Sequence, residues 1–129
     1  MLVELSTNAS DLHRACVRLA TELAHLPEIT DEPVHFDITP KRMEITIERT
    51  STILRAEVRK SGAASIPFTV LAGVLHMLPY FGKNVVEIGF SHGKMHVDTT
   101  VFYSRSILLT GTSCNERRRL SLNNRLESA

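Results

Sequence analysis

Two pairs of histidine and aspartate are the residues of this chain whose types and spacing could do chemistry. His35 and Asp37 alternate along one expected strand, His96 and Asp98 along another, and His92 falls at a turn. Side chains two residues apart share a face of a strand, and imidazole and carboxylate both bind zinc. Zinc requires three or four converging ligands, however. Two separate pairs on solvent-facing strands are more typical of ordinary surface, so we expect no metal and no other cofactor.

The sequence supports neither a catalytic nucleophile nor a phosphate-binding loop. The serines fall in expected turns and helix caps, without the strand–turn–helix elbow of a hydrolase. The six glycines are scattered singly, so no glycine-rich loop is expected. Cys16 and Cys114 have neither metal-ligand nor CxxC spacing. We therefore expect that the protein is not an enzyme. An enzyme or small-molecule binder stays open as an alternative, recognisable by a deep pocket with convergent polar groups.

The composition is that of one globular domain. A chain of 129 residues, 43% hydrophobic and 22% charged, is long enough for one core and too short for two. The formal net charge of +1 means that any affinity for DNA depends on where the charges lie. No run approaches the roughly 20 apolar residues of a membrane span. Without a signal peptide or a disulfide framework, we expect a cytoplasmic, reducing environment and no membrane.

Hydrophobic periodicity predicts one helix and several strands in the first half of the chain. Apolar residues at three- and four-residue steps predict the helix, with Asn8 as a candidate cap, and apolar alternation from Val34 onward predicts the strands. The expected elements are a strand over 3–5, a helix over 9–25, strands over 34–39 and 43–48, a third strand through Leu54, Ala56 and Val58, and a small-residue connection over 59–64.

The second half predicts the same elements in the same order. They are a strand at Ser65–Ile66, a helix from Pro67 to Leu78, and strands over 86–90, 95–97 and 102–109. Five apolar residues of the first half recur 52 positions later, namely Val34, Phe36, Ile38, Met43 and Ile45 as Val86, Ile88, Phe90, Met95 and Val97. A fixed offset indicates an internal repeat. The alternative is that any two hairpins of equal length would align in this way.

The repeat predicts an architecture. We expect an α+β domain over 1–112, built from two β-α-β-β-β repeats at about 1–60 and 61–112 that are related by a pseudo-two-fold axis. Each repeat offers one apolar helix stripe and one apolar sheet face, so both helices can pack on antiparallel sheets. The outermost strands remain open edges, which need protection or join another copy. Residues 113–129 are expected to form a polar, basic tail that is flexible or a frayed helix.

The ordered set of motifs resembles a single domain of the DNA polymerase sliding clamps, and the bacterial replicative clamp most closely. The segment Ala64–Pro67, followed by a helix that closes with Leu78-Pro79, is similar to the second helix of that family. The segments 86–95 and Tyr103–Ser106 resemble its closing strands. The likeness covers about residues 2–110.

This resemblance implies a ring whose inner wall is lined by helices with basic residues that face DNA phosphates, independently of base sequence. Arg14, Arg18, Thr21 and His25 share one face of the first helix, opposite its apolar stripe. A solvated helix surface is the alternative interpretation, since acidic residues flank this face. The second helix carries no lysine or arginine before Lys83, so half of the expected wall is nearly uncharged.

The basic tail offers further candidates for a polyanion. Its arginines are Arg117, Arg118, Arg119 and Arg125, and they surround a Leu-Ser-Leu that only weakly resembles a clamp-binding peptide. A tail without a binding role is the alternative.

We expect a clamp-fold, non-enzymatic protein that binds double-stranded DNA or assists DNA replication as a processivity factor. The candidate DNA-binding residues are Arg14, Arg18, His25, Lys83, Arg117, Arg118 and Arg119. A bacterial clamp chain carries three such domains, so a ring built from this chain requires about six copies joined head to tail through edge strands. The alternative is an interaction module that pairs with another clamp-like chain or polymerase component without encircling DNA.

Overall fold

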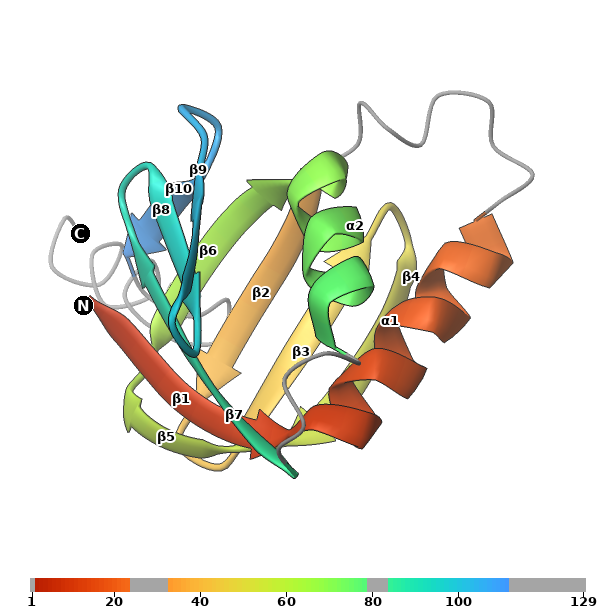
Figure 1. Cartoon of the computed structure of the whole chain (residues 1–129), viewed down its shortest axis with the longest axis horizontal. Coiled ribbons are helices and arrows are strands. Elements are labelled where there is room, and N and C mark those ends of the chain that lie inside the picture. Colours follow the sequence, from red (N-terminus) through yellow and green to blue (C-terminus); the bar gives the residue numbers. More distant parts are fainter. Residues whose placement is uncertain (1, 24–32, 79–83, 112–129) are drawn as a thin grey trace, which may run out of the picture.

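A computed structural model describes residues 2–23, 33–78 and 84–111 of the chain (Figure 1). Within these residues the elements follow one another as β1 (Val3–Asn8), α1 (Ala9–Leu23), β2 (Pro33–Thr39), β3 (Arg42–Ile47), β4 (Thr50–Arg55), β5 (Glu57–Lys60), β6 (Gly62–Pro67), α2 (Phe68–Met77), β7 (Val85–Ser91), β8 (Lys94–Val97), β9 (Thr100–Tyr103) and β10 (Leu108–Gly111).

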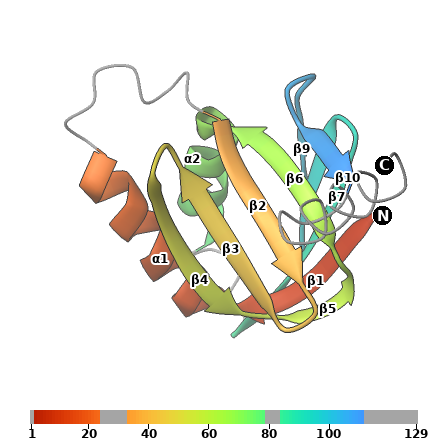
Figure 2. The same ribbon diagram turned by 180° about the vertical axis from the view of Figure 1, so that it is seen from behind.

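The strands form two antiparallel sheets of five, and the fold is α+β as the sequence predicted. One sheet has the order β5-β1-β7-β8-β9 and the other β10-β6-β2-β3-β4. The two helices lie beside each other on one face of the β10-β6-β2-β3-β4 sheet, with α1 next to β4 and α2 next to β2 and β6 (Figure 1), and no helix of the described residues lies on the far face of that sheet (Figure 2). Neither helix is long and apolar enough to cross a membrane.

One apolar core joins both sheets and both helices. Strand side chains alternate between core and solvent, so Val34, Phe36 and Ile38 of β2 are buried. The rings of Phe36 and Phe90, from β2 of one sheet and β7 of the other, have centroids 5.2 Å apart in a tilted arrangement. An aromatic pair in this range adds to the energy of burial. The two halves of the chain therefore share their core.

The two sheets have the same strand order. Each strand of one sheet corresponds to the strand five places later or earlier in the chain, because β5, β1, β7, β8 and β9 take the places of β10, β6, β2, β3 and β4. The strand registers agree as well, because Phe36 pairs with Ile45 and, 52 residues later, Ile88 pairs with Val97. A register irregularity also recurs at the same place, once between β1 and β5 and once between β6 and β10. Such irregularities are specific features of a strand pair, so the halves agree beyond their element order.

The prediction of one strand through Leu54, Ala56 and Val58 was wrong. The chain leaves the first sheet at the end of β4, passes through Ala56, and continues as β5 in the other sheet. The expected strand over 102–109 is likewise divided into β9 and β10. The apolar alternation continues through the first crossover because the two sheets share one core, and all three residues pack against it. Periodicity alone does not reveal such a crossover.

The expected connection over 59–64 was also wrong, since β5 extends to Lys60 and β6 begins at Gly62. Ala63 and Ala64 are buried in the sheet. The start of the first helix was predicted well, because α1 begins at Ala9 and the side chain of Asn8 accepts a hydrogen bond of 3.0 Å from the Asp11 N–H. That contact satisfies one of the free donors at a helix start.

Candidate nucleic-acid interface

Arg14 and Arg18 lie on the solvent-facing side of α1, opposite the buried residues Leu12, Cys16 and Leu19. The helix places them there because residues four apart share a face. Arg18 forms an exposed ion pair of 3.1 Å with Glu22, one helical turn later. Exposed pairs of this kind contribute little energy, so Glu22 competes only weakly with an incoming anion.

Arg55, which the sequence did not single out, joins these two arginines. An open cleft of about 270 Å³ between α1 and β4 is lined by Arg14, Arg18 and Arg55 together with Asp11 and Ile53. No carboxylate of the described residues forms an ion pair with Arg14 or Arg55. The cleft therefore carries two cations that form no ion pair within the described part of the chain, and Asp11 is the acidic residue of its lining.

Arg55 also lies directly opposite Arg42 in the pairing of β3 with β4, and both side chains are exposed. Like charges at directly opposed positions destabilise a sheet. An anion that contacts both would relieve this repulsion. The position of Arg42 thus adds to the positive potential at the end of β4.

A second open cleft of about 650 Å³ lies at the start of α1 and shares Arg55 with the first. Its charges are mixed, since Lys41, Arg55, Asp11 and Glu57 all line it. Thr7 also lines this cleft, and its hydroxyl, in a residue that is 3% exposed, donates a hydrogen bond of 2.8 Å to the Arg55 carbonyl. This contact fixes the main chain at the point where β4 crosses over to β5.

The outer edge of β4 is open. The Ala56 N–H donates to the Lys41 carbonyl over 3.1 Å, and bonded and non-bonded pairs alternate along an antiparallel ladder. Ser51, Ile53 and Arg55 consequently direct their N–H and C=O groups away from β3. Thr7 occupies the Arg55 carbonyl, while no described residue bonds to the main chain of Ser51 or Ile53 on that side.

The edge of β9 is open for the same reason. The Ser104 N–H donates to the Gly93 carbonyl over 3.1 Å, so Val101 and Tyr103 direct their main-chain groups outward. The other two edges are protected. The β7–β8 turn contacts the residue that precedes β10, because the Gly93 N–H of the turn donates a hydrogen bond of 2.8 Å to the Ile107 carbonyl. The edge strand β5 carries Glu57, Arg59 and Lys60, and charge deters further pairing.

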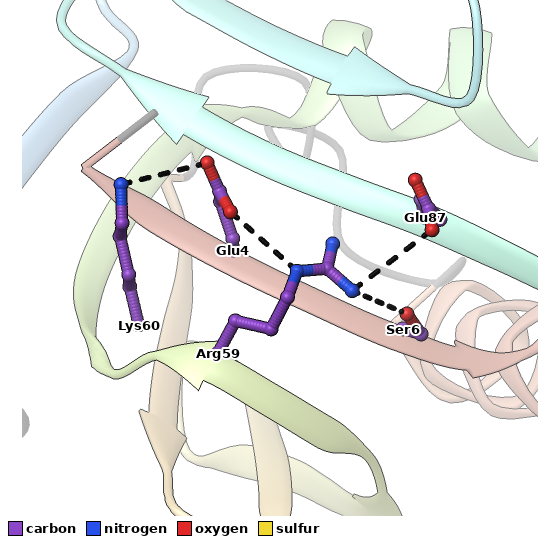
Figure 3. Close-up of polar contacts among 5 residues, drawn as sticks. All are labelled: Glu4, Ser6, Arg59, Lys60 and Glu87. Carbon is purple, nitrogen blue, oxygen red and sulfur yellow. Dashed lines mark hydrogen bonds and ion pairs between the residues drawn. The ribbon is translucent and has the colours of Figure 1, made fainter.

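Arg59 shows what a neutralised arginine looks like in this fold (Figure 3). It reaches across β1 and donates to Ser6 over 3.1 Å, with Glu4 at 3.5 Å and Glu87 at 3.9 Å. Lys60 adds an ion pair of 3.7 Å to Glu4. Cations on this face of the β5-β1-β7 sheet are thus matched by carboxylates, in contrast to those beside β4.

The histidine and aspartate pairs lie on separate strands. His35 and Asp37 are on β2 of one sheet, whereas His96 is on β8 of the other and Asp98 follows it in the β8–β9 turn. Among residues 2–23, 33–78 and 84–111, no group of three or more potential metal ligands converges. Asp98 serves the local turn, where one of its carboxylate oxygens accepts a hydrogen bond of 2.9 Å from the Glu87 N–H.

The expected uncharged face of α2 is present, since Thr69, Ala72 and His76 are its exposed residues. His25, Lys83 and the tail residues Arg117, Arg118 and Arg119 lie outside the described residues. The structure therefore brings together Arg14 and Arg18 of the predicted set and adds Arg55, with Arg42 and Lys41 beside it. The register of β3 against β4 was the signal that could have identified Arg55.

Cys16 is buried in α1, and burial raises the pKa of its thiol to about 12. The thiol is therefore protonated at neutral pH and is a poor nucleophile.

The comparisons with known proteins give no family. No protein-family model matches the chain, and no curated protein matches it.

Proposed function

We propose that this chain is a clamp-fold, non-enzymatic protein that binds double-stranded DNA through sequence-independent phosphate contacts, as a replication accessory or processivity factor does. The observation that carries the proposal is the group formed by Arg14, Arg18 and Arg55, in which two guanidinium groups lack an ionic partner among the described residues. Guanidinium groups bind phosphate oxygens well because their donors match the geometry of the anion.

The agreement between the two halves supports the clamp-like part of the proposal. Two copies of a β-α-β-β-β-β unit, in which the expected last strand is divided in two, are consistent with the shared strand order, the shared register and the repeated irregularity. The resemblance of residues 2–110 to a sliding-clamp domain rests on the same order of elements. Fold and function are separate claims, however, because function depends on sites.

Binding of two unrelated DNA duplexes by fluorescence anisotropy tests the proposal. Both duplexes should bind with similar affinity at low salt, and Arg14→Ala plus Arg18→Ala should weaken both equally. Arg59→Ala is the matched control, because that arginine is already paired with carboxylates. Absence of binding at about 50 mM salt, or binding that the double variant leaves unchanged, would overturn the proposal.

A second candidate function is an interaction module that pairs with another chain through an edge strand. The open edges of β4 and β9 favour it, because their first residues are uncharged and the main-chain groups point outward. Ile53 and Tyr103, one on each edge, are 53% and 71% exposed. The partner is a second copy, a clamp-like protein or a polymerase component. Light scattering after size exclusion tests self-pairing: six subunits favour a closed ring, and a monomer excludes self-closure under those conditions.

A further inference from the structure

The edge of β4 and the adjoining side of α1 form one continuous surface, which we call the β4 strip and define by Arg14, Arg18, Ser51, Ile53 and Arg55. We propose that the β4 strip is a docking site for an extended acidic segment of another protein, which adds to β4 as a further strand. The inference extends the second candidate function and rests on the same open edge.

The main chain of β4 carries the first part of the proposal. Ser51 and Ile53 present unpaired N–H and C=O groups to the open side, and the Arg55 N–H points the same way. These groups recur about every 7 Å, which is the two-residue repeat of a strand. An extended peptide satisfies such a row of groups by strand addition, in which main-chain hydrogen bonds supply affinity.

The side chains beside this edge determine the chemistry of the partner. Arg55 and Arg14 lack carboxylate partners among the described residues, and Arg42 lies directly across from Arg55. Asp11 is the acidic residue that lines the same cleft, and Glu22 is engaged with Arg18. Carboxylates on the incoming strand would pair with Arg14 and Arg55. Such charge-assisted hydrogen bonds are stronger than those between neutral groups.

Ile53 adds one apolar requirement. It is 53% exposed on the outer face of β4, between Ser51 and Arg55. An incoming strand places alternate residues on that face, so the residue beside Ile53 should be apolar and the residue beside Arg55 acidic. The residues that point toward α1 should be acidic, because Arg14 and Arg18 lie there.

A second copy of this chain fits the β4 strip less well than an acidic segment does. A second copy offers two open edges, β4 and β9. Its β4 edge carries the same arginines, and the residues Lys94 and Arg105 that flank β9 are basic and exposed. The Lys94 ammonium lies 5.8 Å from the centre of the Tyr103 ring, which places a positive charge at that edge. Pairing β4 with β9 of a second copy brings cations together, and like charges disfavour an interface.

An acidic strand on the β4 strip would cover the arginines proposed to contact DNA. Peptide and duplex should therefore exclude each other. Nucleic acid by itself provides no ladder of main-chain amides, so it uses the arginines but not the main chain of Ser51 and Ile53. This difference separates the two kinds of partner in an experiment.

The test uses a labelled ten-residue peptide of glutamate with a single central valine, titrated with the full chain in a fluorescence anisotropy assay. Controls are the peptide with lysine in place of glutamate and a fully N-methylated form, which cannot form the main-chain ladder. The acidic peptide should bind, and each control should bind at least about tenfold more weakly. Equal binding of the N-methylated form would overturn strand addition, and absence of binding by the acidic peptide would overturn the proposal.

Variants of the chain locate the site. Ile53→Pro removes an outward N–H and no bond of the β3–β4 ladder, and it should weaken binding about tenfold. Val101→Pro makes the equivalent change on the β9 edge and should leave binding unchanged. If Ile53→Pro does not fold, as judged by circular dichroism, Arg14→Glu plus Arg55→Glu tests the same surface through charge alone. Binding that the charge variant leaves intact would contradict the proposed site.

Adding the DNA duplex separates this inference from the proposed function. Duplex binding without peptide binding removes the docking site and leaves the DNA proposal standing. Peptide binding without duplex binding establishes the docking site and removes the DNA proposal. Where both bind, displacement of the duplex by the peptide is expected, and simultaneous binding would contradict a shared site.

Discussion

The hydroxyl of Thr7 donates a hydrogen bond of 2.8 Å to the main-chain carbonyl of Arg55, although the two residues are 48 positions apart in the chain. Thr7 is the buried polar residue of the described core and is 3% exposed. The bond joins β1 of one sheet to the crossover from β4 to β5, and it holds the residue that contributes to both clefts beside α1.

Thr7→Val removes this donor and keeps the shape of the side chain. The Arg55 carbonyl then loses its buried partner, and we expect the free energy of unfolding to fall by about 1–2 kcal/mol. Thr39→Val is the matched control, because its hydroxyl contacts the Arg42 carbonyl at 3.5 Å in an exposed position. That change should stay within about 0.5 kcal/mol. Urea unfolding measures both, and equal effects would contradict the assigned role of Thr7.

Gly73 of α2 lies against Phe102 of β9, and the fit leaves no room for a methyl group. A Cβ at position 73 would lie 2.9 Å from Cε1 of Phe102. Alanine favours a helix over glycine by about 1 kcal/mol, whereas overpacking costs about 1–3 kcal/mol. We expect Gly73→Ala to lower the melting temperature in the native background.

Phe102→Leu provides the control for that prediction. The smaller side chain removes the contact, so Gly73→Ala should become stabilising when both changes are combined. Lowered stability in both backgrounds would show that the contact between α2 and β9 does not limit residue 73.

Burial of Cys16 predicts both slow reactivity and a pH effect. In a Cys114→Ser variant, a thiol reagent should label the native protein slowly and the unfolded protein fast, because the raised pKa keeps the buried thiol protonated. The pKa is about 12 in the folded state against a usual value of 9.0. The unfolded chain therefore loses this proton first as the pH rises.

The stability that this shift contributes is complete below about pH 9 and is lost as the pH rises from about 9 toward 12. Unfolding in urea at pH 7 and pH 10 measures it. The loss of stability should be smaller in Cys16→Ala than in the native sequence, since other groups that titrate in this range are common to both. Equal losses would contradict the assignment to Cys16.

The sequence predicted the core well because burial on a strand depends on periodicity. Phe36, Ile45, Ile88 and Val97 are all buried as expected, since apolar alternation determines which strand face points inward. Periodicity also explains why the crossovers from β4 to β5 and from β9 to β10 were missed. Leu54, Ala56 and Val58 keep one alternation while the chain passes from one sheet to the other.

The candidate site was predicted only in part. Helix periodicity places Arg14 and Arg18 on one face, but Arg55 approaches them from a strand that is distant in sequence. The β3–β4 hairpin register could have placed Arg55 opposite Arg42, but its approach to Arg14 and Arg18 depends on the packing of α1 against β4, which is not a local property of the chain. The open or protected state of each edge also depends on tertiary contacts, such as that of the β7–β8 turn with the chain leading into β10.

The salt dependence of duplex binding tests the proposed DNA contacts most directly. The logarithm of the binding constant should fall with the logarithm of the salt concentration, with a slope of about −0.9 for each phosphate neutralised. Arg14→Ala and Arg55→Ala should each reduce the slope by about 1, and Arg59→Ala should leave it unchanged. A slope that is the same in all four proteins, or no binding at about 50 mM salt, would contradict DNA recognition by the arginines beside β4.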